Sequence, residues 1–273
     1  MKNLIFAIML SSVFFMGTPA QALYAINGDI SDWGIVDLGE ASVKGYLNSH
    51  LPSGGNDIDY VTEDNTDVDT GGPVGPGYST GNLYDAEAIY FDNDNEFVYL
   101  AIISGLPQTS PFEPSSRTRF FGPGDIFIDT GRYQDPLSLE YDANKLYRYG
   151  FAVDISEKKL YSVNTWNQSV YEQHRADSDL WSIGSGTDQG AIEFAYSSIA
   201  VNSHYVMEAK IPLAMIGIGH GESDVWLSWT MECGNDFLKM KADAAVAPEP
   251  MTLVLLSGGL LGVFSTRRKR KVS

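Results

Sequence analysis

Hydrophobic and polar residues alternate in short runs along most of the chain between residues 23 and 247, and helical periodicity is hard to find there. In residues 204–211, for example, the odd-numbered side chains are apolar or aromatic, whereas the even-numbered ones include Glu208 and Lys210. Successive side chains of a strand point to opposite faces, so the odd-numbered positions are predicted to face a core. Alternation of this kind occurs in residues 96–103, 125–129, 147–154, 159–163, 191–196, 204–211 and 225–231.

Residues that favour turns separate these runs. The stretch Asp92-Asn93-Asp94-Asn95 predicts a tight hairpin, because Asp and Asn side chains hydrogen-bond their own backbone. Seven or more short strands joined by turns predict an all-β fold, a single antiparallel β-sandwich with jelly-roll or immunoglobulin-like layers. Residues 45–83 and 105–124 break the pattern, and the first of these regions predicts a long insertion rich in Gly and Asp.

The first 22 residues are predicted to be a secretory signal peptide. Lys2 is followed by a short apolar core, and the stretch closes on Ala20-Gln21-Ala22, the small-x-small pattern that precedes a cleavage site. An uncleaved membrane anchor is the alternative, for which the apolar stretch is short. The protein is therefore expected to be exported, with residues 23–247 as its folded body.

Residues 248–273 have the composition of a membrane-spanning tail. Residues 251–266 carry no charge, and the cluster Arg267, Arg268, Lys269, Arg270 and Lys271 follows them. Sixteen residues are somewhat fewer than the roughly 20 that cross a bilayer as a straight helix, but snorkelling cations allow this transmembrane helix to span. Because Lys and Arg favour the cytoplasmic side, the C-terminus is expected in the cytoplasm and the body outside.

This tail resembles the PEP-CTERM sorting signal of Gram-negative bacteria. The matching parts are Pro248-Glu249-Pro250, the Thr252-Leu253 step, the glycine-containing stretch 258–262 and the terminal basic cluster. The resemblance implies that an exosortase, a membrane cysteine protease, removes the tail at the inner membrane as the protein goes to the cell surface or the extracellular matrix. An ordinary single-span anchor is the alternative, but it would not need the Pro-Glu-Pro triplet.

Charge separates the body from the two ends. The chain has 35 acidic and 18 basic side chains and a net charge of −17, but six of the basic residues lie at the ends. The body therefore holds 34 acidic and 12 basic side chains, a net charge of −22. Affinity for nucleic acid depends on Lys and Arg, so this balance excludes a nucleic-acid-binding protein. The single cysteine, Cys233, cannot form a disulfide within its own chain, so stability is expected from a core or from bound cations.

The body opens with Ile26-Asn27-Gly28-Asp29-Ile30-Ser31-Asp32-Trp33, in which the aspartates are expected to form or cap a turn and Trp33 to close one end of the core. Together with residues 87–92, 97–102 and 124–129 and the step Lys210-Ile211-Pro212-Leu213, this order of motifs resembles family-nine carbohydrate-binding modules and DOMON-type domains. The resemblance covers most of the body and implies a β-sandwich. In the sugar-binding members it also implies a ligand held between tryptophan rings.

Tryptophan rings are the candidates for sugar contact, because an aromatic face packs on the apolar C–H surface of a sugar. Trp226 and Trp229 are three residues apart in one predicted strand, so one should enter the core while the other can face outward. Trp166 and Trp181 flank a polar stretch that supplies partners for hydroxyl groups. The candidate glycan contacts are therefore Trp166, Trp181 and Trp226, although a structural role for each is the alternative.

Two groups of carboxylates are candidates for binding Ca²⁺, which prefers hard oxygen ligands. The candidate ligands are Asp57, Asp59, Asp64, Asp67 and Asp69 in the insertion, or Asp92 and Asp94 in the hairpin. Their spacing does not match an EF-hand loop. A solvated acidic loop is the alternative explanation.

No catalytic residue is predicted. A nucleophilic Cys233 would need a base, but the four histidines, His50, His174, His204 and His220, are scattered without a dyad motif, and no zinc-binding spacing is present. Residues 231–236 are expected to end the last long strand, with a structural turn at Gly234-Asn235-Asp236.

The sequence thus predicts an exported, non-catalytic protein that contacts extracellular polysaccharide. A Ca²⁺-binding structural or adhesion protein of the exopolysaccharide matrix is the second possibility. A glycosidase-like enzyme is the third, since its carboxylates would be brought together only by the fold.

Overall fold

The computed structural model describes residues 23–38, 49–53, 57–62, 85–109, 121–130, 150–168, 180–199, 204–219, 221–234 and 236–246. The predicted signal peptide and the predicted sorting tail lie outside these ranges. Within them, no helix has both the length and the hydrophobicity needed to cross a membrane. The transmembrane helix at residues 251–266 therefore stays a prediction.

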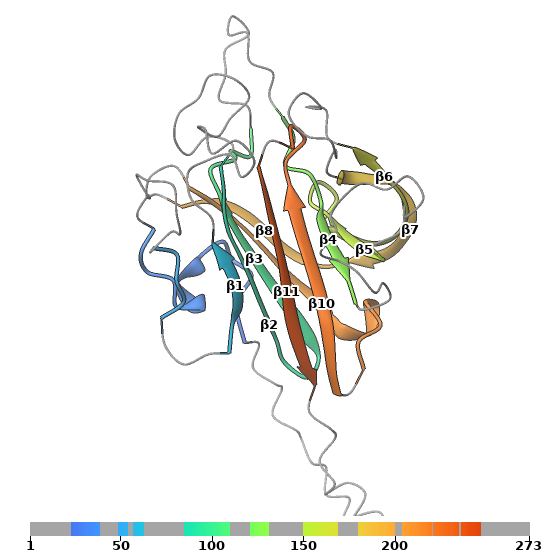
Figure 1. Cartoon of the computed structure of the whole chain (residues 1–273), viewed down its shortest axis with the longest axis horizontal. Helices are drawn as coiled ribbons and strands as arrows, with labels where there is room; N and C mark the ends of the chain where they lie inside the picture. Colours follow the sequence, from blue (N-terminus) through green and yellow to red (C-terminus); the bar gives the residue numbers. More distant parts are fainter. Residues whose placement is uncertain are drawn as a thin grey trace, which may run out of the picture.

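Two antiparallel sheets pack face to face, which confirms the predicted all-β sandwich (Figure 1). The strand order is β1-β2-β3-β9-β8 in the first sheet and β11-β10-β4-β5-β6-β7 in the second. The strands are β1 (Asp59–Thr62), β2 (Ala86–Asn93), β3 (Phe97–Ser104), β4 (Ile126–Asp129), β5 (Phe151–Asp154), β6 (Lys159–Gln168), β7 (Leu180–Ala191), β8 (Glu193–Ser198), β9 (Tyr205–Pro212), β10 (Gly221–Thr230) and β11 (Phe237–Val246). Two 3-10 helices, η1 (Ile30–Trp33) and η2 (Leu213–Met215), complete the described elements.

Three strands differ from the predictions. β1 lies inside the region 45–83 that the sequence marks as irregular, where it pairs with β2. β11 pairs with β10 over its whole length, so the expectation that residues 231–236 end the last long strand is wrong. β7 is rich in Ser and Gly and forms a strand because it pairs with β6.

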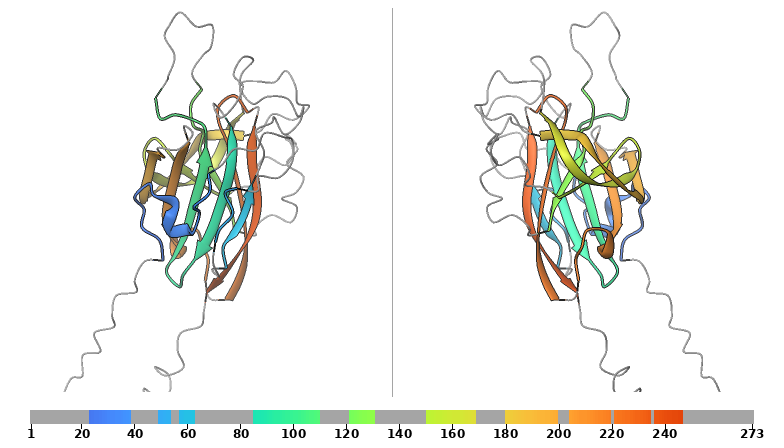
Figure 2. Two further views of the ribbon diagram at one scale, coloured as in Figure 1. Left: turned by 90° about the vertical axis from the view of Figure 1, so that its left-hand side faces the viewer. Right: turned by 90° about the vertical axis from the view of Figure 1, so that its right-hand side faces the viewer.

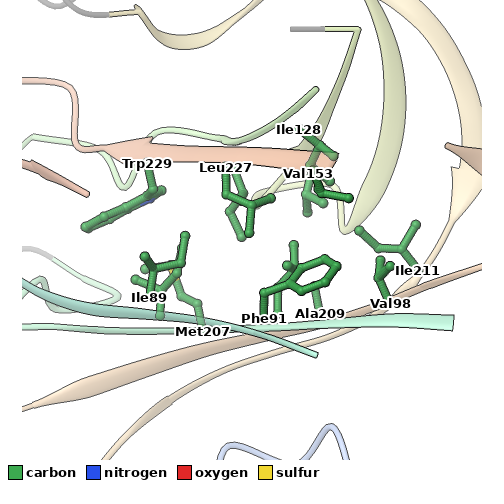
Figure 3. Packing of buried hydrophobic residues seen from close by; sticks show 14 of the residues in the cluster. Ile89, Phe91, Val98, Ile128, Val153, Met207, Ala209, Ile211, Leu227 and Trp229 are labelled. Atoms are coloured by element: carbon green, nitrogen blue, oxygen red, sulfur yellow. The ribbon is translucent and has the colours of Figure 1, made fainter. Parts of the chain in front are cut away.

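The main core fills the space between the two sheets (Figure 3). Ile89, Phe91 and Met207 reach it from the first sheet, and Leu227 and Trp229 reach it from β10. The alternation in residues 204–211 predicts that the odd-numbered side chains face this core, and those at 207, 209 and 211 do so. Tyr205, at the start of β9, is half-buried and is not part of this core. Burial of large apolar side chains contributes about 1.5–3 kcal/mol each, so this layer is the main source of stability.

A second core covers the outer side of the first sheet. The N-terminal segment lies against that side (blue in Figure 2), and the Trp33 ring stacks on Tyr24 with centroids 3.9 Å apart and planes 11° apart. Trp33 is therefore buried as expected, but outside the main core rather than at one end of it. This cover also buries outward-facing residues such as Tyr90 and Val206.

The N-terminal motif is held to β9 by one buried carboxylate, Glu208. Its oxygens accept hydrogen bonds from the backbone N–H groups of Asn27 (3.1 Å) and Gly28 (2.6 Å) and from Trp33 Nε1 (3.1 Å). Gly28 has a φ of 81°, and a Cβ at this position would collide with Ser197. Burial raises the pKa of Glu208 to about 7 against the opposing effect of these hydrogen bonds.

Asp29 and Asp32 shape the turn that precedes Trp33, as predicted. The Asp29 carboxylate accepts a hydrogen bond from the Ser31 N–H at 3.0 Å and so caps η1. The Asp32 carboxylate accepts from the Ala25 N–H at 2.8 Å. These two aspartates therefore fix the local backbone that brings Trp33 over the sheet.

Side chains from the first sheet also hold the outer edge of β11. The Asn93 amide accepts from the Ala245 N–H and donates to the Ala245 carbonyl, each at 3.0 Å. Asp59 accepts from the Asp243 N–H at 2.8 Å. These bonds join the two sheets along one side of the sandwich.

Candidate functional site

The two tryptophans of β10 point to opposite sides of the second sheet, as their spacing predicts. Trp229 is buried in the main core, whereas Trp226 is half-buried and belongs to the outer side. Trp226 pairs with Asp129 on β4 and with Lys241 on β11. Trp226 is therefore flanked by a carboxylate on one neighbouring strand and by an ammonium group on the other.

Charged groups are fixed around the Trp226 ring. Lys241 Nζ lies 5.9 Å from the ring centroid and 2.9 Å from Asp224 Oδ1, and this contact with Asp224 raises the pKa of Lys241. Ser228 lies two residues further along β10 on the same side, in register with Phe127. Asp129 and Ser228 are themselves buried, so the exposed polar groups beside the ring are Lys241 and Asp224. The half-buried ring and this ion pair offer stacking and hydrogen bonding to a polar ligand.

Trp166 lies on the outer side of the same sheet and packs against Phe127. The two ring centroids are 4.5 Å apart with an interplanar angle of 71°. Together with Ala152, Val163, Leu180 and Ile183, these rings form a small apolar cluster. Trp166 is thus partly occupied in packing, which is the structural role that the sequence left open for it.

Trp181 lies where the start of β7 contacts the residue that precedes β4. Its carbonyl accepts from the Asp125 N–H at 2.8 Å, and the Asp125 carboxylate accepts from the Ile183 N–H, also at 2.8 Å. Figure 1 shows β6 and β7 curving at this end of the second sheet. Burial raises the pKa of Asp125 to about 7. The Trp181 ring lies beside Gly122, next to this junction.

The candidate Ca²⁺ ligands are placed only in part. Asp64, Asp67 and Asp69 lie outside the described residues. Asp94 is engaged as a turn former, because its carboxylate accepts from the N–H groups of Glu96 and Phe97 and from the Tyr99 hydroxyl.

Two of the remaining candidate carboxylates accept hydrogen bonds from protein groups. Asp92 accepts from the Tyr24 hydroxyl at 2.5 Å, and Asp59 accepts from the backbone of β11. Burial raises the pKa of Asp92, and the charges of Asp57 and Asp59 add to this effect. In the described part of the chain, these carboxylates do not converge into a group that could hold a metal ion.

A different group of side chains converges at the start of β2 and β9. His50 Nε2 lies 2.8 Å and His204 Nε2 lies 2.7 Å from the same oxygen, Glu87 Oε2. All three side chains are at most 1 % exposed. Burial alone would raise the pKa of Glu87, but the nearby His204 and His50 rings outweigh it, and this pKa lies below its ordinary value.

The backbone and the flanking residues hold His50 in place. Its φ of 64° is in the left-handed region, which a residue with a side chain rarely adopts. The His50 N–H donates to the Asp37 carbonyl at 2.7 Å, and the His50 carbonyl accepts from the Tyr90 hydroxyl at 2.7 Å. His50 Nδ1 lies 2.8 Å from the Ser49 hydroxyl oxygen. These contacts direct Nε2 toward Glu87.

Sequence reasoning missed this cluster because its members are far apart in the chain. The strand order supplies the missing signal: Ser104, the last residue of β3, pairs with Ala86 on one side and with Tyr205 on the other. Glu87 and His204 therefore lie at the same end of the sheet, on either side of β3. Only the pairing of β2 and β9 with the same strand reveals this.

Cys233 and the turn after β10 have the structural surroundings that the sequence predicts. Cys233 is buried and belongs to the main core. Asp236 accepts from the backbone N–H groups of Ala86 (2.6 Å) and Phe237 (2.9 Å), and its carbonyl accepts from the Thr230 hydroxyl (2.6 Å). The turn therefore ties the start of β11 to the start of β2.

Comparison of this chain with models of protein families, with curated proteins and with solved structures gave no significant match.

Proposed function

We propose that this chain is an exported, exosortase-sorted surface protein whose β-sandwich binds carbohydrate and has no catalytic activity. The sorting part rests on the N-terminal signal peptide and on the Pro248-Glu249-Pro250 tail. The binding part rests on the outer side of the second sheet. The β-sandwich itself is compatible with both parts.

The finer assignment of the fold, to a sandwich like those of family-nine carbohydrate-binding modules and DOMON-type domains, is part of this proposal. It is supported by the way the opening motif folds: Asp29 caps a turn and Trp33 packs against the first sheet. Jelly-roll or immunoglobulin-like layering is the corresponding expectation for the strand connections.

One observation carries the binding proposal, namely the position of Trp226. Its half-buried ring lies on the outer side of β10, between Asp129 and Lys241, with Asp224 beside the lysine. A sugar ring can stack its C–H surface on the indole while its hydroxyl groups bond the exposed charges of Lys241 and Asp224. Extracellular polysaccharide is the partner that this chemistry fits.

Retention of the purified protein on polysaccharide and glycan arrays tests the binding proposal. Trp226→Ala should lower retention by about tenfold or more, whereas Trp226→Phe keeps a ring and should retain most of it. Tyr60→Ala is the matched control, because Tyr60 is an exposed aromatic residue on the opposite sheet. If wild-type protein is retained on no glycan, or if Trp226→Ala binds like wild type, the binding site is not here.

The sorting proposal has its own test. Replacement of Pro248, Glu249 and Pro250 by Ala should leave the uncleaved protein in the inner membrane of an exosortase-containing host. Fractionation followed by mass measurement of the C-terminus distinguishes retained from processed chains. Normal release of the altered protein would contradict the proposal.

A Ca²⁺-binding structural protein of the matrix is the second candidate function. The observation that favours it is that the charges of Asp57 and Asp59 act on Asp92, where they add to the effect of burial in raising its pKa. Under this alternative, millimolar Ca²⁺ raises the Tm and chelator lowers it, with Asp92→Asn abolishing the response. A Tm that does not change with Ca²⁺ removes the support for this candidate.

A further inference from the structure

We propose that His50, Glu87 and His204 form a binding site for a divalent transition metal, with Zn²⁺ as the ion that fits these ligands. Their ligand atoms all lie within 4.8 Å of one another, and the three side chains are buried. Imidazole nitrogen and carboxylate oxygen are both established ligands of Zn²⁺. This site is separate from the outer side of the second sheet and does not depend on carbohydrate binding.

One atom of the cluster, Glu87 Oε1, is buried without a hydrogen-bond partner among the described residues. The other oxygen of this carboxylate, Oε2, lies at hydrogen-bond distance from both rings, 2.8 Å from His50 Nε2 and 2.7 Å from His204 Nε2. Buried polar atoms without such partners are costly, since each loses its bonds to water. A cation between the rings and the carboxylate would give Glu87 Oε1 a partner and would replace the two ring contacts of Oε2.

The orientation of His50 also fits a metal ligand. A histidine that binds a metal through one ring nitrogen generally engages the other nitrogen with a neighbouring group, which fixes the ring. Here the Ser49 hydroxyl lies 2.8 Å from Nδ1, and the left-handed backbone of His50 is bonded to Asp37 and Tyr90. Strained backbone of this kind persists where the surroundings require it, often at a functional site.

The separations within the cluster are those of hydrogen bonds and would widen around an ion. Two ligands of one tetrahedral Zn²⁺, each about 2.0–2.2 Å from the metal, lie roughly 3.3 Å apart. The histidine nitrogens are 2.8 Å and 2.7 Å from Glu87 Oε2, about 0.5 Å closer. Small rotations of the side chains would open this space. Ca²⁺ fits poorly, because it takes six to eight oxygen ligands.

A metal here would join three parts of the chain that are distant in sequence. His50 lies in the segment 49–53 beside the N-terminal cover, Glu87 lies on β2, and His204 directly precedes β9. The site adjoins the second core through the bond from Tyr90 to the His50 carbonyl. Because the site is buried, the ion would be acquired as the protein folds, and it would stabilise the cover on the first sheet.

The direct test is metal binding by the full-length protein, purified in detergent, unfolded with chelator and refolded with or without Zn²⁺. We expect one equivalent of bound Zn²⁺ per chain by inductively coupled plasma mass spectrometry. At a free Zn²⁺ concentration of 100 times the dissociation constant, the Tm should rise by about 5–10 °C. Absence of stoichiometric Zn²⁺ from wild-type protein refolded with the metal would overturn the proposal and leave a metal-free His–Glu–His contact.

Variants assign the bound ion to this site. His50→Gln, Glu87→Gln and His204→Gln should each weaken Zn²⁺ binding by at least 100-fold. Glu208→Gln is the matched control, since it changes another buried carboxylate under the same cover and should bind Zn²⁺ like wild type. Unchanged binding in all three ligand variants would place the ion elsewhere and refute the assignment.

A spectroscopic measurement on wild-type protein keeps the test valid if a variant fails to fold. X-ray absorption of the Zn²⁺-loaded chain should show imidazole scattering from two histidines and a nearest shell at about 2.0–2.1 Å. A shell made only of oxygen, or one containing sulfur from Cys233, would contradict the proposed ligand set.

Discussion

Glu87 and Glu208 are both buried carboxylates on strands of the first sheet, but their surroundings differ in kind. Glu208 accepts hydrogen bonds from two backbone N–H groups and the Trp33 indole, none of which titrates. Glu87 Oε2 meets two imidazole nitrogens, both of which can titrate, and Glu87 Oε1 has no hydrogen bond among the described residues. The first arrangement holds a segment in place, whereas the second resembles a set of ligands. The groups that contact a buried carboxylate therefore indicate its role better than its degree of burial does.

The largest effect is expected from removing the Glu208 carboxylate. Glu208→Ala leaves the buried indole N–H of Trp33 and the partly buried N–H groups of Asn27 and Gly28 without their acceptor, so the free energy of unfolding should fall by about 3–5 kcal/mol. Urea unfolding followed by Trp fluorescence measures this loss. Glu208→Gln keeps an acceptor oxygen and should lose less. If both variants lost the same free energy of unfolding, the hydrogen bonds of Glu208 would not be the cause of the destabilisation.

A smaller loss of stability is expected when the pH is raised. The Glu208 carboxyl has a pKa of about 7 in the folded protein, against an ordinary value of 4.5, so the folded chain binds this proton more tightly than the unfolded chain. This contribution is fully present below about pH 4.5 and is lost as the pH rises through 7, by up to about 3 kcal/mol.

Unfolding free energies between pH 5 and 8 for wild type and Glu208→Gln test this expectation. The variant has no proton to lose at this position, so its stability should fall less steeply over the interval. Parallel curves for the two proteins would show that Glu208 does not titrate differently in the folded state. Asp125 also has a pKa of about 7 and therefore contributes to both curves. Subtracting one curve from the other cancels this shared contribution.

The smallest effect concerns the backbone that presents His50 to Glu87. His50→Gly and His50→Ala both remove the ring, but only glycine adopts a φ of 64° without strain. His50→Gly should therefore be about 1 kcal/mol more stable than His50→Ala, when both are measured in the presence of chelator. The opposite order would show that the left-handed conformation is not maintained once the ring is gone.

Alternation in the sequence was sufficient to predict most strands, and the exceptions have physical reasons. β3 and β9 follow the expected positions closely, because each places apolar side chains on the main core. β11 also alternates, but its inward residues include Ala242 and Ala244, whose small side chains give a weak signal. β7 has little apolar character and forms because it pairs with β6.

The candidate sites were predictable only where the information is local. The opposite directions of Trp226 and Trp229 follow from their spacing within one strand. The meeting of His50, Glu87 and His204 depends on β2 and β9 pairing with the same strand, and strand order is not encoded by local pattern. Burial of Val206 and Glu208 on the outward side of β9 likewise depends on the N-terminal segment folding over the sheet.

The bonds along β11 have a consequence for how neighbouring molecules meet. β11 is the edge strand of its sheet, and exposed edges invite strand addition and aggregation. Asn93 occupies both backbone groups of Ala245, and Asp59 occupies the N–H group of Asp243. A second copy that approached this edge would find these groups already bonded, so chains crowded side by side could not extend the sheet from one to the next at this point.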